Sequence, residues 1–124
     1  MPFTYAFDPE ARLVRTTARG VIRFDDLASH VQALAAAGLA RIPQLIDARQ
    51  AQHELSSSDM RRLVGLVATL RTPGEHKGRT ALVVTRAADY GMARMYGTLA
   101  EESDPGFAVF HDLAEAEAWL RASD

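Results

Sequence analysis

Serine and charged side chains gather where an apolar segment, residues 44–47, is followed by a predicted helix. Asp47 and Arg49 come first, and Ser56 and Ser57 stand at the start of the helix. The free backbone N–H groups of a helix N-terminus bind anions. With Arg49 nearby, this group could hold a phosphate or a carboxylate. The alternative interpretation is a well-capped helix beside a surface arginine.

A metal site would draw on His53, Glu54, His111 and Asp112. If the last three strands are neighbours in chain order, the first and last of these strands lie roughly 10 Å apart. Zinc requires ligand atoms within about 2.0–2.2 Å, so we expect no metal. We expect His30 at a helix border, without a chemical role.

Nucleophilic catalysis has little support in the sequence. Ser57, His53 and Asp47 can be written as a triad, but a capping serine already bonds to the backbone. The chain has no cysteine, no Gly-x-Ser-x-Gly elbow and no Walker-type loop. We therefore expect no catalytic residue and no cofactor, and we do not expect an enzyme.

Tyr90 and Arg94 are four residues apart and share one face of a predicted helix. On a helical wheel that face lies opposite the predicted core stripe, so the pair should point away from the core. It is either a stacked pair in solvent or a contact surface, since tyrosine and arginine are common interface anchors. The stripe consists of Met92, Met95, Tyr96 and Leu99.

Composition and charge restrict the class of protein. The 124 residues are 48% hydrophobic and 24% charged, which fits a single domain over residues 1–124. No apolar run is long enough for a membrane span and no signal peptide is visible, so we expect a cytoplasmic protein. The net charge is −2, and basic residues 61–86 lack interleaved aromatic residues, so we expect no nucleic-acid binding.

Strands and helices alternate along the chain. Strands are predicted at residues 3–7, 13–17, 44–47, 80–85 and 107–110. Helices are predicted to follow Asp25, Ser56 and Asp112 as N-caps, and to span about 88–102, with stop signals at Gly38 and residues 72–74. The order is β-β-α-β-α-β-α-β-α, an α/β fold. Its five-stranded sheet should be mostly parallel, with an antiparallel edge strand from the opening hairpin.

The helix after Ser56 carries two independent start signals. Asp59 stands three residues after Ser56, an acidic form of the capping box. In the same register, Leu55 and Met60 form a hydrophobic staple.

Two predicted strands, residues 81–84 and 107–110, are apolar on both faces. Right-handed crossovers between strands laid down in order would place the helices on one face only. The other face would then need the opening hairpin, a ligand or a second subunit as its cover. Phe3, Tyr5 and Phe7 would form part of that cover, and we predict a homodimer.

This order of elements resembles the STAS or SpoIIAA-like fold, and more closely the small stand-alone SpoIIAA-like (STAS/SEC14-like) bacterial proteins. The segments that carry the resemblance are Gly20-Val21-Ile22, Leu45-Ile46-Asp47-Ala48-Arg49, residues 90–95, Val109-Phe110 and Trp119-Leu120.

In signalling STAS domains an Asp-Ser-Ser-Gly sequence opens a helix, and one of its serines is phosphorylated. Ser56 and Ser57 fall at the serines, but Leu55 replaces the aspartate and Ser58 the glycine. A kinase or anti-sigma partner that reads those residues should not recognise this loop well.

The resemblance thus implies a fold rather than an activity. We expect a non-enzymatic binding or regulatory module that acts through protein contacts. The alternative is a carrier of a small ligand, apolar, lipid-like or anionic, in a SEC14-like pocket. The candidate contact residues for either function are Asp47, Arg49, Ser56, Ser57, Tyr90 and Arg94.

Overall fold

The computed structural model describes residues 2–70 and 78–122, and its elements follow the predicted order. The predicted stop of the second helix at residues 72–74 lies outside this range. The strands are β1 (Phe3–Asp8), β2 (Leu13–Ile22), β3 (Gln44–His53), β4 (Thr80–Val83) and β5 (Phe107–Phe110). The helices are α1 (Phe24–Ala36), α2 (Ser57–Leu70), α3 (Ala87–Leu99) and α4 (Leu113–Arg121).

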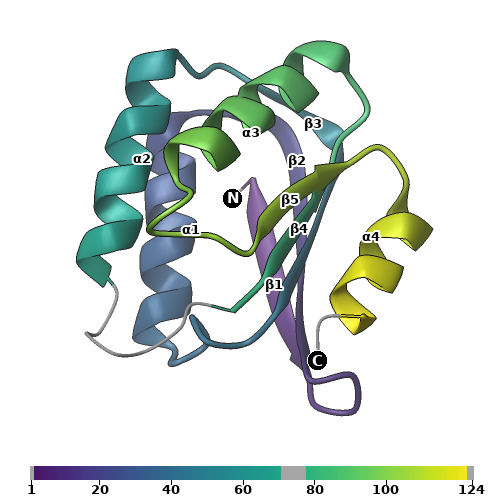
Figure 1. The fold of residues 1–124 in the computed structure, drawn as a ribbon. Coiled ribbons are helices and arrows are strands. Elements are labelled where there is room, and N and C mark those ends of the chain that lie inside the picture. The colour runs from purple at the N-terminus through teal and green to yellow at the C-terminus, as the bar shows by residue number, and fades with distance from the viewer. Residues whose placement is uncertain (1, 71–77, 123–124) are drawn as a thin grey trace.

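The five strands form one sheet in the order β1-β2-β3-β4-β5. β1 is antiparallel to β2, and each later pair is parallel, which confirms the predicted α/β class. The crossover helices α1, α2 and α3 cover one face of the sheet (Figure 1). Their inner side chains form a shared core, in which Met60 and Leu63 of α2 pack with Tyr96 of α3.

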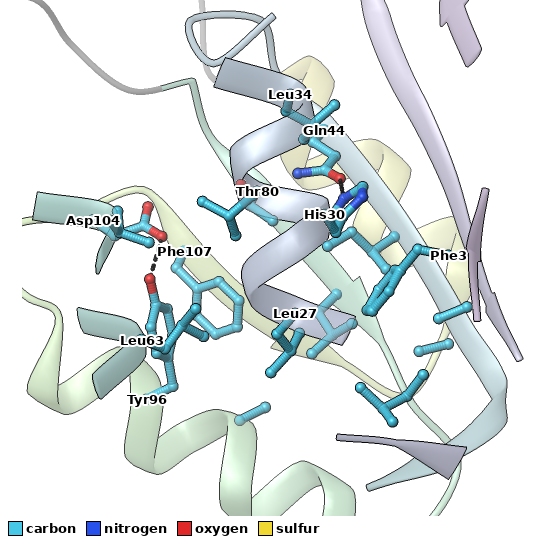
Figure 2. A pocket seen from close by; sticks show the side chains of 18 of the residues that line it. Phe3, Leu27, His30, Leu34, Gln44, Leu63, Thr80, Tyr96, Asp104 and Phe107 are labelled. Carbon is cyan, nitrogen blue, oxygen red and sulfur yellow. Dashed lines mark hydrogen bonds between the residues drawn. The ribbon is translucent and has the colours of Figure 1, made fainter. Parts of the chain in front are cut away.

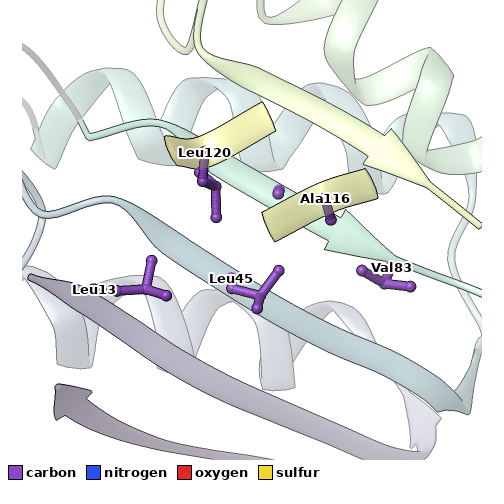
Figure 3. Packing of buried hydrophobic residues seen from close by; sticks show 6 residues of the cluster. Leu13, Leu45, Val83, Ala116 and Leu120 are labelled. Atoms are coloured by element: carbon purple, nitrogen blue, oxygen red, sulfur yellow. The ribbon is translucent and has the colours of Figure 1, made fainter. Parts of the chain in front are cut away.

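The prediction that the other face lacks a helix of its own is wrong. α4 is not a crossover, because no strand follows it, and it packs on the face opposite α1–α3 (Figure 1). Ala116 and Leu120 of α4 pack on Leu13, Leu45 and Val83 of the sheet (Figure 3). A second subunit is therefore not needed to bury this part of the sheet.

β2 and β3 are both longer than their apolar runs predict. Thr17 pairs with Asp47, but Arg19 pairs with Gln50, so β3 has one extra residue between these pairs. This bulge breaks the alternation of faces, and Ala48 and Ala51 pack in the same core cluster. A strict period of two cannot follow such a strand, and the predicted strand therefore ended too early, at residue 47.

One of the two predicted ends of α1 is confirmed and the other is wrong. Gly38 adopts a positive φ of 74° and donates to Ala35, while Leu39 donates to Leu34, the Schellman pattern that ends the helix as predicted. The predicted N-cap Asp25 is wrong, because the helix begins two residues earlier, with Arg23 as its N-cap. The Asp26 carboxylate accepts from the Arg23 backbone N–H at 2.9 Å.

The core stripe of α3 differs from the predicted one. Tyr96 is buried and Met92 packs beside it, as predicted. Met95 and Leu99 are each 39% exposed, so their place in the stripe is wrong. Asp89 and Ala93 are buried instead, as is Ala100 at the C-cap. A wheel ranked by hydropathy misses this face because its residues are small or charged.

Candidate ligand pocket between the sheet and helices α1, α2 and α3

A pocket of about 210 Å³ lies between the sheet and the three crossover helices (Figure 2). Apolar side chains from the sheet and from the helices on this face line it, among them Leu27 of α1, Leu63 of α2, Phe107 of β5 and Ile46 of β3. Protein interiors are close-packed, and voids larger than a water molecule are few. A space of this size is therefore a candidate binding site.

Small residues on the sheet and on α3 explain why this space exists. Ala18 of β2, Ala48 of β3 and Ala93 of α3 are all buried and all line the pocket. A methyl group fills less volume than the branched or aromatic side chains usual in a core, so alanine at these positions leaves space between the sheet and the helices. The bulge in β3 adds a further alanine, Ala51, to the same wall.

One polar group of the pocket is centred on Gln44. Its Oε1 accepts from the Thr16 hydroxyl at 2.7 Å. The same oxygen lies 2.7 Å from His30 Nε2 (Figure 2). Because this amide oxygen only accepts, His30 must donate from Nε2. The His30 ring also stacks on Phe3, with centroids 4.6 Å apart. His30 is thus buried inside the fold. The prediction that it lies at a helix border is wrong.

A second polar group pairs Tyr96 with Asp104. The Tyr96 hydroxyl donates to Asp104 Oδ2 at 2.9 Å, and both residues are buried (Figure 2). Burial, and then the Asp104 charge, raise the pKa of Tyr96 far above its usual value. The hydroxyl therefore stays protonated and remains a donor to Asp104.

A third polar group joins β3 to α3. Asp89 is 8% exposed and lines the pocket, and its Oδ1 accepts from the His53 backbone N–H at 3.1 Å. The same oxygen pairs with Nδ1 of the His53 ring. Asp89 Oδ2 is buried, and it has no hydrogen-bond partner within residues 2–70 and 78–122. Asp89 was not among the residues predicted from the sequence. It could have been found as an acidic residue in the first turn of a helix that follows a buried strand.

Asp47 and Arg49 do not join this pocket. They pair with each other, Arg49 Nη2 lying 2.8 Å from Asp47 Oδ2, and this hydrogen bond holds the pKa of Asp47 below its usual range. Leu45 on the same side of β3 packs against α4, and the Asp112 charge acts on Arg49 from the start of α4. Arg49 therefore does not form the predicted anion site with the start of α2, which covers the opposite face.

Ser56 and Ser57 lie at the exposed start of α2. The Ser56 hydroxyl accepts from the Asp59 N–H at 3.1 Å, and the Asp59 carboxylate accepts from the Ser56 N–H at 2.9 Å. This reciprocal pair confirms the predicted capping box. Leu55 and Met60 pack in one cluster, as the staple requires.

Replacing Ser56 with alanine should lower the free energy of unfolding by about 1 kcal/mol, because the Asp59 N–H loses its acceptor. Ser57→Ala is the matched control and should be nearly neutral, since Ser57 is the first helical residue and has no capping bond. Urea unfolding followed by circular dichroism measures both changes. Equal losses in the two variants would contradict the assignment of Ser56 as N-cap.

Tyr90 and Arg94 share a face of α3, but Tyr90 does not point away from the protein. Its ring is partly buried and stacks on His111, with centroids 4.3 Å apart and planes 13° apart. The Arg94 guanidinium lies 6.0 Å from the Tyr90 ring and is exposed. The predicted direction of this pair is therefore wrong for Tyr90 and correct for Arg94.

Among the described residues, no cluster of three or more His, Asp or Glu side chains is arranged to hold a metal ion. The predicted set His53, Glu54, His111 and Asp112 is divided, since His53 pairs with Asp89 while His111 stacks on Tyr90. Over the same part of the chain, no helix is long and apolar enough to cross a membrane.

The order of the strands, the edge hairpin and the three crossover helices define a SpoIIAA-like fold. A solved structure with this fold, an uncharacterized protein of the DUF3478 family from Shewanella loihica PV-4, matches with a TM-score of 0.61. It is 20% identical in sequence, and the match covers 95% of this chain and 93% of that one. No family model and no curated protein matches the chain. The resemblance predicted from the sequence is thus confirmed for the fold.

Proposed function

We propose that this protein binds a small, mainly apolar molecule in the pocket between the sheet and α1–α3. The observation that carries this proposal is a pocket of about 210 Å³ with an apolar lining. An engineered cavity of about 150 Å³ with a comparable lining binds benzene. Scaling from that case gives a ligand of roughly eight to ten non-hydrogen atoms.

The number of elements that line the pocket supports binding over an accidental packing defect. Its lining comes from all five strands and from all three crossover helices. Most polar groups in the lining have protein partners, as the bonds of Gln44 and Tyr96 illustrate. The site thus combines an apolar body with a few placed polar groups, which is typical of small-molecule sites.

Protein contact through a homodimer is the second candidate function. It is favoured by Tyr5 and Phe7 of β1, which are 39% and 44% exposed. β1 is an edge strand that pairs with β2 alone in the described sheet. Exposed aromatic side chains on an open edge are suited to pairing with a second copy.

One titration tests the first candidate and also reports on the second. Propylbenzene is added to ¹⁵N-labelled protein, and amide chemical shifts are followed while sedimentation gives the mass of the same sample. We expect saturable shifts at Leu27, Leu63 and Ala93, which line the pocket. A sedimenting mass near 13.6 kDa at micromolar concentration would contradict the homodimer and leave the ligand proposal standing.

A pocket-filling variant sharpens the titration. Ala51→Leu places a larger side chain on the pocket wall and should weaken propylbenzene binding at least tenfold. Ala114→Leu makes the same change at an exposed position of α4, on the other side of the sheet, and should bind as the parent does. Absence of saturable shifts, or equal binding by both variants, would contradict the proposed function.

A further inference from the structure

The polar lining of the pocket has a gap at Asp89. Tyr96 bonds Asp104, and the Thr16 hydroxyl and the His30 ring both bond Gln44. The second oxygen of Asp89, Oδ2, is buried and has no partner among the described residues. Buried polar atoms in native proteins are nearly always hydrogen-bonded, and an exception calls for an explanation.

The surroundings hold the Asp89 side chain in place. Its Oδ1 accepts a hydrogen bond from the His53 backbone N–H and also pairs with Nδ1 of the His53 ring. His53 and Asp89 are 36 residues apart in the sequence. Asp89 is also the third residue of α3, where the positive end of the helix dipole favours a carboxylate. The carboxylate is thus fixed at one end, and Oδ2 is the oxygen left for another group.

From this geometry we infer that the ligand of the pocket carries an N–H or O–H donor at one end, which bonds to Asp89 Oδ2. The inference rests on the proposed function and names the class of ligand: a small amphipathic alcohol or amine with an apolar body. The body would lie on the alanine-rich wall formed by Ala48 and Ala93, which line the same pocket.

The same geometry disfavours an anionic ligand, which the sequence had left open. A carboxylate placed against Asp89 would bring two like charges together in an apolar site. Arg41 also lines the pocket, but it already has interactions of its own. Acids of matching size are therefore expected to bind more weakly than alcohols or amines.

Four probes of similar size and shape test the inference: propylbenzene, 2-phenylethanol, 2-phenylethylamine and phenylacetate. We expect 2-phenylethanol or protonated 2-phenylethylamine to bind at least tenfold more tightly than propylbenzene, and phenylacetate to bind most weakly. If propylbenzene binds as tightly as both donors, or phenylacetate binds best, the inference fails while the proposed function survives. If no probe binds, the proposed function itself fails.

Two variants assign the donor preference to one carboxylate. Asp89→Asn replaces the free oxygen with an N–H donor, so the advantage of 2-phenylethylamine over propylbenzene should fall to within twofold. Asp104→Asn is the matched control, since Asp104 is also buried and lines the pocket, and it should keep the advantage. Loss of the advantage in Asp104→Asn alone would overturn the assignment.

A measurement on the parent protein keeps the inference testable if Asp89→Asn does not fold. The ¹³Cγ resonance of Asp89 should shift on saturation with whichever donor probe binds more tightly. Propylbenzene should leave the resonance nearly unchanged. Equal shifts with the donor probe and with propylbenzene would overturn the proposed bond.

Discussion

Replacing Gly78 with alanine is expected to lower the free energy of unfolding by about 3 kcal/mol. A Cβ at this position would lie 2.3 Å from the carbonyl oxygen of Ile42 and 2.9 Å from the carbonyl carbon of Arg41. Both are backbone atoms, so no side chain can rotate away. The Gly78 N–H also donates to the Ala40 carbonyl at 2.9 Å, which holds the two segments together.

Gly65→Ala is the matched control for this prediction. Gly65 lies inside α2, and a Cβ there would meet nothing within 4 Å. Alanine is favoured over glycine in a helix interior, so this variant should be stabilised by about 0.5–1 kcal/mol. Urea unfolding measures both variants, and a similar effect of the two substitutions would contradict the close approach at Gly78.

Leu45→Ala should lower the free energy of unfolding by about 2–5 kcal/mol. Leu45 is 4% exposed and packs with Leu13 and Leu120 in the cluster that joins the sheet to α4 (Figure 3). Truncation removes buried methyl groups and leaves a space between two rigid layers. Because this cluster lies across the sheet from the pocket, propylbenzene affinity of the folded variant should not change.

Leu99→Ala provides the control. Leu99 is 39% exposed on α3, so its truncation should cost less than about 0.5 kcal/mol. The helical wheel predicted that Leu99 lies in the core. If that were correct, Leu99→Ala would lower the free energy of unfolding about as much as Leu45→Ala. Thermal or urea unfolding of the two variants therefore also tests whether Leu99 is in the core, as the helical wheel predicted, or exposed, as in the structure.

Several helix boundaries could be read from the sequence because the forces that set them act within a few residues. Three of them depend only on residues a few positions apart: the Ser56 and Asp59 pair, the Asp112 side chain that accepts from the Glu115 N–H, and the positive φ of Gly38. The alternation of strands and helices was equally local. With the rule that parallel strands need crossovers, it was enough to predict a mostly parallel sheet with an antiparallel edge strand. The SpoIIAA-like fold came from the resemblance to known proteins.

The position of α4 and the length of β3 needed the tertiary structure. A helix after the last strand can pack on either face, and packing with Leu13 and Leu45 determined which. The bulge in β3 depends on pairing with β2, so it left no alternation that a scan of the sequence could follow.

The candidate site depended most on tertiary structure. The pocket exists because small side chains at Ala18, Ala48 and Ala93, far apart in the chain, face the same space. Asp89 became notable only when the fold placed it against His53 and left Oδ2 without a partner in the described chain. A local sequence pattern indicates which face of one helix or strand is apolar. A pocket, or a buried atom without a hydrogen bond, depends on which side chains the other elements place around it.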